Sequence, residues 1–567
     1  MSSQTHPTSA VAHDVRIEAD VEIGLRDGVR LRSDVFSPAA GGRYPVLINL
    51  GPYQKDKVWV PPPDLEEAAN PYMNWETVNP LWWVPRGYAC VRVDTRGSGR
   101  SPGQTDPWSL REAIDFYDAI EWAGRQSWCN GAVGTIGISY FAMTQWLVAN
   151  LKPPSLKAMI PWEGAADMYR DLAYHGGIFC LGFIGNWYNN HMAHHMLGRR
   201  SQDSADAFAL NWLWQYMRDS LDTGVYYGRQ ARWDEIDIPL YSAGNWSGMG
   251  LHLRGNTEGY ARARTRQKKL RIHAGTHYHP FYAEEARADQ LRFFDHWLKG
   301  RDTGIMAEPP VKLLIRTGGG HNYEWRREQE WPLARTRWMP YYLQPSASLP
   351  QRPGEPVEGL LQLESPRSSN SVSYSASGMS KAGVASASWT STVLAGSLPR
   401  LGVFFETAPL EAPLEITGPA VLTLWVASTT EDMDHFATLR NIDPDGRDVW
   451  EIGQQQQPVP VAKGWLRASH RKLDPSLSLP YRPYHAHDER QWLTPGETVR
   501  LDVEIWPTCM VFARGHRIRL DIQPRDGVGS APYTHYSADY NTGTNTIHTG
   551  GITASHLLLP VIARDGA

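Results

Sequence analysis

Hydrophobic residues in the first half of the chain follow the pattern of a mostly parallel β-sheet. Apolar and polar residues alternate on both sides of Arg26-Asp27-Gly28 over 15–36, which predicts a β-hairpin. Helical spacing is found at 110–122 and 286–298. Strands buried on both faces are predicted by short apolar runs at 45–50, 88–94, 132–138, 156–160, 238–243 and 270–274. Strands that alternate with helices indicate an α/β fold.

The pattern changes after Gly300, where short alternating runs separated by turn residues predict an all-β sandwich. The stretch between the strands at 156–160 and 238–243 is rich in Trp, Tyr, Met and His. Its helical spacing over 204–221 predicts an inserted helical cap. The expected organisation is therefore a disordered terminus at 1–14, an α/β domain at 15–164 and 236–305, a cap at 165–235 and a β domain at 306–567.

A serine lies at a sharp junction in the segment G-A-V-G-T-I-G-I-S-Y-F-A-M-T-Q-W, which spans 131–146. An apolar strand leads through Gly137 to Ser139, and a helix-compatible segment follows at once. In α/β-hydrolases this strand, turn and helix arrangement strains the serine backbone and exposes Oγ as a nucleophile. The alternative is that Ser139 only caps the helix, because Ser is a favoured N-cap.

Composition narrows the class of partner. The formal net charge is −4, with 56 basic and 60 acidic residues, so we expect neither nucleic acid nor a membrane but a small-molecule partner, with a homo-oligomer possible. The four cysteines have no C-x-x-C spacing and the N-terminus lacks a secretory signal, which favours the cytoplasm. His191, His194 and His195 have no acidic or Cys ligand nearby, so we expect no metal and no cofactor.

Several motifs together resemble the cocaine esterase and X-prolyl dipeptidyl aminopeptidase family of α/β-hydrolases, the CocE/NonD type. They include N-L-G-P-Y-Q-K at 49–55, V-D-T-R-G-S-G-R-S-P-G at 93–103, F-F-D-H-W-L-K-G at 293–300 and F-A-R-G-H-R-I-R-L at 512–520, and the likeness extends from Val21 to about Pro560. The resemblance implies an α/β-hydrolase domain with an inserted helical cap and a C-terminal, galactose-binding-like jelly-roll domain.

The resemblance also implies a catalytic set. Ser139 would be the nucleophile, and the Tyr140 N–H and the Tyr53 hydroxyl would form the oxyanion hole. The base would be His279, in the loop after the last strand, with His277 two residues earlier as its competitor.

The chain departs from the family pattern where the acid of the triad is expected. The corresponding turn reads A-G-N-W-S-G-M-G, with Gly248 in place of Asp. A triad histidine needs a partner that holds its tautomer. We expect Glu163, at the end of the strand after the nucleophile strand, to supply the carboxylate, with Asp167 as the second choice and Glu258 as a distant third. Asn245 or a water could instead orient the histidine.

A second departure is Phe141, where the family usually has a small residue. We expect Phe141 either to point into the substrate pocket or to displace the helix.

These residues predict a serine hydrolase that cleaves an ester or amide through an acyl-enzyme. An exopeptidase that releases X-Pro dipeptides is the first alternative. A catalytically weakened protein that binds a ligand through its jelly-roll domain is the second.

Overall fold

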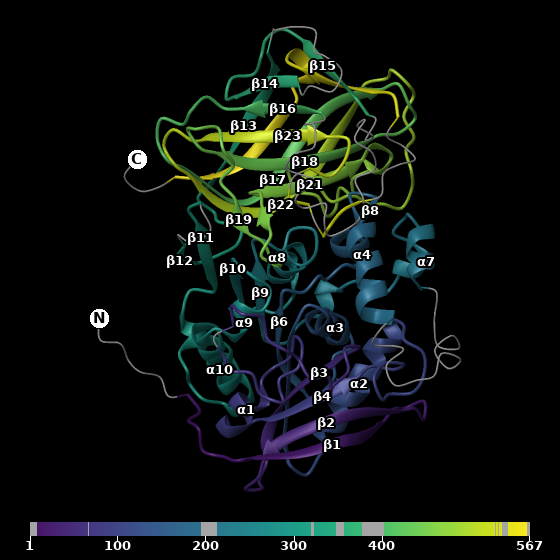
Figure 1. The fold of residues 1–567 in the computed structure, drawn as a ribbon, viewed down its shortest axis with the longest axis vertical. Helices are drawn as coiled ribbons and strands as arrows, with labels where there is room; N and C mark the ends of the chain where they lie inside the picture. Colours follow the sequence, from purple (N-terminus) through teal and green to yellow (C-terminus); the bar gives the residue numbers. More distant parts are fainter. Residues whose placement is uncertain are drawn as a thin grey trace.

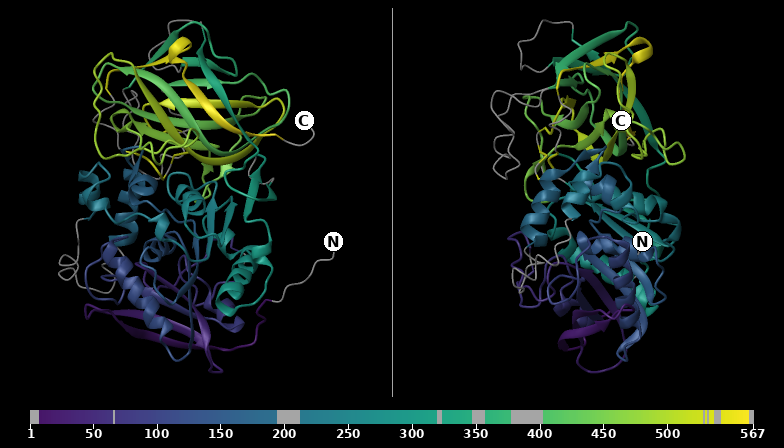
Figure 2. Two further views of the ribbon diagram at one scale, coloured as in Figure 1. Left: turned by 180° about the vertical axis from the view of Figure 1, so that it is seen from behind. Right: turned by 90° about the vertical axis from the view of Figure 1, so that its right-hand side faces the viewer.

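Two bodies are stacked along the long axis of the molecule, with the N-terminal half below and the C-terminal strands above (Figure 1, Figure 2). The computed structural model describes residues 8–65, 67–193, 212–318, 323–346, 357–376, 402–527, 529–530, 532–535 and 542–563. The predicted α/β domain and the all-β domain that follows it are both confirmed.

The lower body is built on one sheet that is parallel over its central strands. The predicted hairpin forms its first two strands, with Gly28 at a φ of 87° in the turn. Within the described residues the strand order is β1 (Val15–Gly24), β2 (Arg30–Pro38), β4 (Ala89–Asp94), β3 (Tyr44–Gly51), β5 (Cys129–Ile138), β6 (Leu156–Trp162), β9 (Leu240–Asn245), β10 (Lys268–His273), β11 (Val311–Arg316) and β12 (Tyr323–Glu328).

Helices cover this sheet and place the strand ends that matter for function. They are α2 (Leu110–Gly124), α3 (Tyr140–Ala149), α8 (Leu253–Arg262) and α10 (Glu284–Lys299). The central strands β3, β5 and β6 are almost wholly buried, as their continuous apolar runs predict. Because these strands are parallel, their carboxyl ends and the loops that follow them share one edge of the sheet.

The sheet extends past the predicted domain boundary at residue 305. Strand β11 pairs in parallel with β10, and β12 pairs antiparallel with β11. Strand β11 is an internal strand that is buried along almost its whole length, so it completes the α/β sheet although it follows the change in pattern after Gly300.

The predicted loose N-terminus is bound to the α/β domain over the part that the structure describes. Ser9 is buried, and its N–H and hydroxyl donate to the Asp295 carboxylate at 2.6 and 2.7 Å. The Ala12 N–H donates to the Pro85 carbonyl at 2.7 Å. Polar residues at this end therefore satisfy partners on α10 instead of remaining in solvent.

The cap between β6 and β9 consists of short helical pieces beside the junction of the two bodies (Figure 1). Of the predicted helix at 204–221, the structure shows α7 (Trp212–Arg218), and 204–211 lie outside the described residues. The other described helical pieces are η2 (Met168–Ala173), α4 (Leu181–Trp187), η3 (Tyr188–Met192), η4 (Gly224–Tyr226) and η5 (Trp233–Glu235), and a two-stranded ribbon is formed by β7 (Tyr174–His175) and β8 (Ile178–Phe179).

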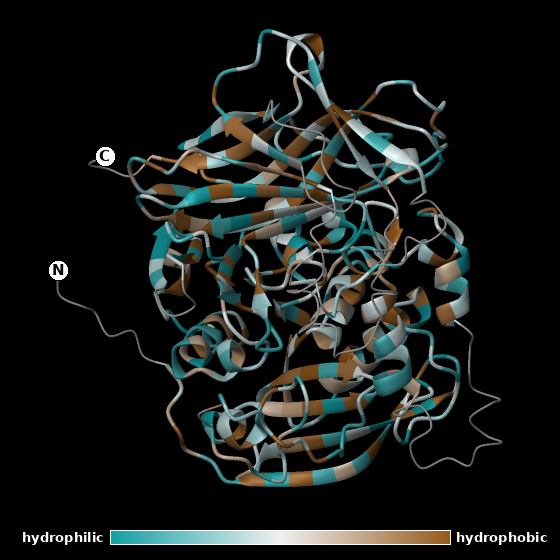
Figure 3. Cartoon of the chain, turned by 45° about the horizontal axis from the view of Figure 1, so that its top comes forward, coloured by the Kyte–Doolittle hydropathy of each residue, from teal (hydrophilic) through white to brown (hydrophobic). Residues whose placement is uncertain are grey.

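The upper body is a second sheet that curves back on itself, because its last strand in the order, β25, also pairs with β17, which pairs with β22 and β24 as well. Hydrophobic and hydrophilic residues alternate along its strands, so one face lines a core (Figure 3). The jelly-roll connectivity stays a prediction. The described order is β15 (Asn370–Ser375), β24 (Thr544–Thr549), β17 (Leu414–Ser428), β22 (Val499–Phe512), β21 (Ala462–Arg467), β18 (Asp434–Ile442), β23 (Arg517–Gln523), β16 (Val403–Glu406), β14 (Val357–Gln362), β13 (Thr336–Pro345) and β25 (His556–Ile562).

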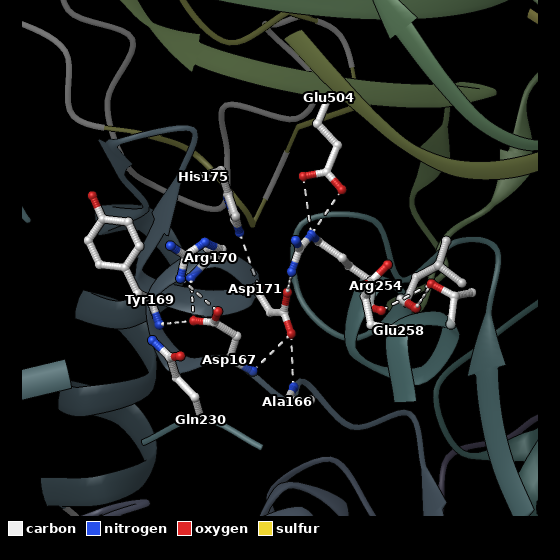
Figure 4. Close-up of polar contacts among 12 residues, drawn as sticks. Ala166, Asp167, Tyr169, Arg170, Asp171, His175, Gln230, Arg254, Glu258 and Glu504 are labelled. Carbon is white, nitrogen blue, oxygen red and sulfur yellow. Dashed lines mark hydrogen bonds and ion pairs between the residues drawn. The ribbon is translucent and has the colours of Figure 1, made fainter. Parts of the chain in front are cut away.

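A buried arginine joins the cap, the α/β domain and the β domain. Arg254 on α8 binds Asp171 of η2 at 2.9 Å and Glu504 of β22 at 3.0 Å (Figure 4). The guanidinium lies between two carboxylates from different parts of the chain, and all three groups are largely removed from solvent. This ion network therefore ties the three units together.

Replacing Arg254 with methionine should weaken the folded state strongly. Arg254→Met keeps an unbranched apolar stem but leaves two buried carboxylates without their cation, which typically costs about 3–5 kcal/mol. We expect a lower urea midpoint for unfolding, measured by circular dichroism. Arg447→Met removes an exposed ion pair and should leave the midpoint almost unchanged. Equal midpoints for Arg254→Met and wild type would show that the network does not hold the units together.

Candidate active site

Ser139 occupies a strained turn between β5 and α3. Strand β5 ends at Ile138 and α3 begins at Tyr140, while Ser139 itself has φ 57° and ψ −114°. Its side chain makes no capping hydrogen bond, so it does not serve as the helix N-cap that was the alternative. The Ser139 N–H donates to the carbonyls of Trp162 and Glu163 at 3.0 and 3.1 Å, which fixes the turn against the end of β6. This is the geometry of a nucleophile elbow.

Phe141 is not among the residues that line the cavity beside Ser139, which was one of its two predicted positions. Its side chain is buried and packs at the end of β3, where a Cβ atom on Gly51 would come within 2.4 Å of the ring. Gly137 leaves space on the other side of Phe141, because a Cβ atom at position 137 would lie 2.5 Å from the Phe141 Cβ. Two glycines therefore make room for Phe141, Gly51 beside its ring and Gly137 beside its Cβ atom.

Ser139 lines a cavity of about 430 Å³ that lies at the meeting point of the α/β domain, the cap and the β domain. The cap contributes aromatic walls such as Trp187, and the β domain contributes Gln454 and Tyr533. Tyr53, Glu76 and His277 line the same cavity, whereas His279 does not. The cavity therefore combines a candidate nucleophile, a histidine and an apolar wall.

The carboxylate of Glu163, directly after β6, is buried and accepts four hydrogen bonds. Asn245 Nδ2 and His273 Nε2 donate to Oε1 at 3.1 and 2.7 Å. His277 Nδ1 donates to Oε2 at 2.6 Å, and Gln454 Nε2 also donates to Oε2. Burial alone would raise the pKa of Glu163, but the charge of His277 and the hydrogen bonds from His273 and His277 hold it below its ordinary value. Glu163 is therefore ionised.

His277 lies in the loop after β10 with a carboxylate on each side of its ring. Its Nδ1 faces Glu163, and its Nε2 lies 3.1 Å from Glu76 Oε1. Burial opposes protonation, but the two carboxylates outweigh it and raise the pKa of His277 to about 10. His252 stacks on the same ring at 5.4 Å, and burial lowers the pKa of His252 to about 3. The acid predicted from the sequence thus meets a histidine, but that histidine is His277.

His279 and the two alternative acids, Asp167 and Glu258, lie away from the Glu163–His277 pair. His279 starts helix α9 (His279–Tyr282), and its Nδ1 donates to the Asp64 carbonyl at 2.9 Å. Asp167 caps η2 and binds Arg170 at 2.9 Å, and Glu258 binds Arg482 at 2.6 Å (Figure 4 shows Asp167 and Glu258). Among the polar contacts of the described residues, none joins these three side chains to Glu163 or His277.

Gln454 reaches the acid from the turn between β19 (Glu451–Ile452) and β20 (Pro458–Val459). Tyr533, also from the β domain, donates its hydroxyl to Gln454 Oε1 at 2.9 Å and so orients the amide toward Glu163. A Cβ atom on Gly248 would lie 3.2 Å from Gln454 Nε2. The Gln454 amide therefore fills the space beside the position where the family pattern has its aspartate.

Two oxyanion donors were predicted, and both lie beside Ser139. The Tyr140 N–H opens helix α3, so it has no acceptor within the helix. The Tyr140 hydroxyl is anchored by the Glu112 carboxylate at 2.8 Å, and burial raises the pKa of Glu112 to about 7. Tyr53 lines the cavity and its hydroxyl accepts a hydrogen bond from Trp187 Nε1 at 2.9 Å. Burial raises the pKa of Tyr53, which keeps it a protonated donor.

No sequence motif identified three residues of the site, which are Glu76, His273 and Gln454. Glu76 lies in an aromatic-rich loop, His273 ends a buried strand, and Gln454 opens a run of four glutamines. Their meeting at Glu163 and His277 depends on contacts between residues that are far apart in the chain.

Two groups of described residues place three potential metal-ligating atoms within 4.8 Å of one another. The first is Glu163, His252 and His277, which is the acid–histidine site. The second is His175, Cys180 and His535, where His175 Nδ1 and His535 Nε2 are 2.7 Å apart, a hydrogen-bond distance. We assign no metal to either. His191 instead packs its ring on Trp75 at 4.9 Å, and His194 and His195 lie outside the described residues.

No described helix combines the length and apolar character needed to cross a bilayer.

Two family models match the chain in succession. Residues 27–279 match the X-Pro dipeptidyl-peptidase (S15 family) model, and residues 303–558 match the X-Pro dipeptidyl-peptidase C-terminal non-catalytic domain. The first match contains Ser139, Glu163 and His277, and the second contains Gln454.

Individual relatives match nearly the whole length. A Mycobacterium bovis protein whose provisional name is serine esterase is 27% identical, covering 95% of this chain and 94% of its own. Cocaine esterase of a Rhodococcus strain is 26% identical over 97% and 99%. The crystal structure of a CocE/NonD family hydrolase from Staphylococcus aureus is 30% identical, with a TM-score of 0.84 over 96% of this chain and 93% of that one. The chain belongs to the CocE/NonD and X-Pro dipeptidyl-peptidase family of α/β-hydrolases and is a serine hydrolase.

Proposed function

We propose that the protein hydrolyses a small-molecule ester or amide with Ser139 as nucleophile, His277 as base and Glu163 as acid of the triad. The observation that carries this proposal is that the strained Ser139 and the Glu163–His277 pair meet at one cavity. We assign to His277 the role of base that the sequence resemblance implied for His279. Of the two histidines, His277 contacts Glu163, whereas His279 contacts the Asp64 carbonyl.

Each residue has a defined step in this mechanism. Ser139 Oγ attacks the carbonyl carbon while His277 Nε2 takes the hydroxyl proton, and Glu163 stabilises the imidazolium that forms. The Tyr140 N–H and the Tyr53 hydroxyl donate to the oxyanion, where loss of one donor typically costs about 100- to 1,000-fold in kcat. His277 then protonates the departing alcohol or amine, and water repeats the sequence on the acyl-enzyme.

The walls of the cavity support a substrate with a bulky apolar group. Trp75, Trp108 and Trp187 line it together with Met143 and Phe183, and few charged side chains do so. Cocaine esterase, one of the relatives, carries the name of an ester substrate. An ester or amide with an aromatic or aliphatic acyl group suits such walls.

An exopeptidase that releases X-Pro dipeptides is the second candidate. The match of residues 27–279 to the S15 family model favours it. Release of dipeptide from an Ala-Pro-aryl amide, compared with turnover of simple aryl esters, separates the two candidates. The alternative of a catalytically weakened ligand-binding protein was suggested by Gly248 in place of an aspartate. That reason no longer applies if Glu163 supplies the carboxylate, as proposed here.

Several finer expectations stay predictions: the cytoplasmic location, the homo-oligomeric state, the jelly-roll connectivity, and activity without a cofactor.

Ser139→Ala should abolish covalent labelling by a fluorophosphonate probe and lower kcat on aryl esters by about 10⁶-fold, because no nucleophile remains to form the acyl-enzyme. Labelling is read by fluorescence in a gel and turnover by release of the chromophore. Persistent labelling of the variant would place the nucleophile elsewhere.

The two histidines can be distinguished by matched substitutions. His277→Ala should lower kcat by about 10⁴-fold or more, because the base is lost. His279→Ala should leave kcat close to wild type, because His279 does not line the cavity and its Nδ1 donates to the backbone carbonyl of Asp64. Steady-state kinetics on one aryl ester provide the comparison, and the reverse order of effects would restore His279 as the base.

Glu163→Gln should lower kcat by about 100- to 10,000-fold while Ser139 remains in place, because the amide cannot hold the imidazolium as a carboxylate does. Asp167→Asn is the matched control, since Asp167 contacts Arg170 and not His277. It should lower thermal stability and leave kcat near wild type. Full turnover by Glu163→Gln would refute the assignment.

A further inference from the structure

A second carboxylate, that of Glu76, lies against the other side of the His277 ring. Glu76 is 3% exposed and lines the same cavity as Ser139. Its backbone has φ 62°, and its carbonyl accepts the Ile138 N–H at 3.0 Å. Because Ile138 immediately precedes Ser139, the elbow itself fixes the position of Glu76.

The contact made by Glu76 involves the nitrogen that the mechanism needs. His277 Nε2 lies 3.1 Å from Glu76 Oε1, and no hydrogen bond from His277 to Ser139 is recorded among the described residues. An ionised carboxylate only accepts hydrogen bonds, and a neutral imidazole has a single N–H to donate. His277 faces carboxylates at both nitrogens, so it is either an imidazolium or it shares a proton with Glu76.

We propose that Glu76 is a positioning residue that holds His277 Nε2 in the substrate-free enzyme, keeping the histidine protonated and turned away from Ser139 until the pair separates. This inference rests on the proposed role of His277 as the base.

The charged and titratable groups beside His277 all enter this balance. His273 shares the Glu163 carboxylate with His277, and burial lowers the pKa of His273. Glu163 approaches from the end of β6 and Glu76 from the loop before the first helix, and both favour the imidazolium. His252 on the N-terminal side of α8 is neutral because burial lowers its pKa, and Gln454 from the β domain is uncharged. Tyr278, the next residue, is also neutral, since burial raises its pKa. The two carboxylates therefore decide the protonation state.

The pair releases the base when His277 loses its Nε2 proton. The Nε2–H bond breaks and the proton passes to water by way of the Glu76 carboxylate, which leaves a neutral imidazole beside an ionised Glu76. Burial raises the pKa of Glu76, which makes the transfer to its carboxylate easier. The free Nε2 lone pair can then accept the Ser139 proton and later pass it to the leaving group.

Glu76→Gln tests the proposal because it removes the charge and keeps the size of the side chain. Only unprotonated His277 can act as base, so kcat/KM rises as pH rises through the pKa of His277. Loss of one neighbouring carboxylate should lower the pKa of His277. The rising limb of the pH profile should therefore move toward lower pH by about one to three pH units. The ratio of kcat/KM at pH 7 to that at pH 9.5 should therefore increase about tenfold or more.

A matched control and a second readout separate this inference from a purely structural role. Glu67→Gln removes a carboxylate from the same loop that contacts Asn79 and Arg287, so it should leave the limb unmoved. In Ser139→Ala protein with ¹³C-labelled histidine, the His277 signal, assigned through His277→Gln, should titrate at lower pH when Glu76→Gln is added.

An unmoved limb and an unmoved His277 titration in Glu76→Gln would overturn the inference, even if activity fell. Such a result together with an inactive, unlabelled Ser139→Ala variant would leave the proposed function intact. Activity that survives Ser139→Ala would instead refute the proposed function itself.

Discussion

The buried carboxylate of Glu163 is the group on which the active site depends. An ionised carboxylate away from water is stable only when its oxygens are fully hydrogen-bonded. Its four donors come from the ends of β9 and β10, the loop after β10 and the β domain. Its own backbone carbonyl accepts the Ser139 N–H. Satisfying this one charge therefore sets the positions of the proposed acid, base and nucleophile at the same time.

The C-terminal domain takes part in this arrangement, although the matching family model describes it as non-catalytic. Gln454 donates to Glu163, Tyr533 orients Gln454, and both line the cavity. The Gln454 amide lies beside Gly248, where the family pattern has an aspartate. The Arg254 network also joins the β domain to the α/β domain and the cap.

Local patterns predicted most of the fold and the centre of the site. The hairpin turn at Gly28, the buried strands and the elbow at Ser139 each follow from a short stretch of sequence. Glu163 was predicted by its place after β6. The choice between His277 and His279 could not be made from spacing, because it depends on where β10 ends and α9 begins. The packing of Phe141 could not be predicted because the space it fills is created by Gly51 on another strand, and Glu76 and Gln454 approach the site only through tertiary contacts.

The central claim is that Ser139, His277 and Glu163 form one catalytic unit with Tyr53 and the Tyr140 N–H as oxyanion donors. A crystal structure of the enzyme after reaction with a fluorophosphonate tests it most directly. The account predicts phosphorus bonded to Ser139 Oγ, a phosphoryl oxygen between the Tyr53 hydroxyl and the Tyr140 N–H, and His277 Nε2 turned from Glu76 toward the adduct with Nδ1 still on Glu163. An adduct on another residue, or His279 beside the phosphorus with His277 still on Glu76, would contradict it.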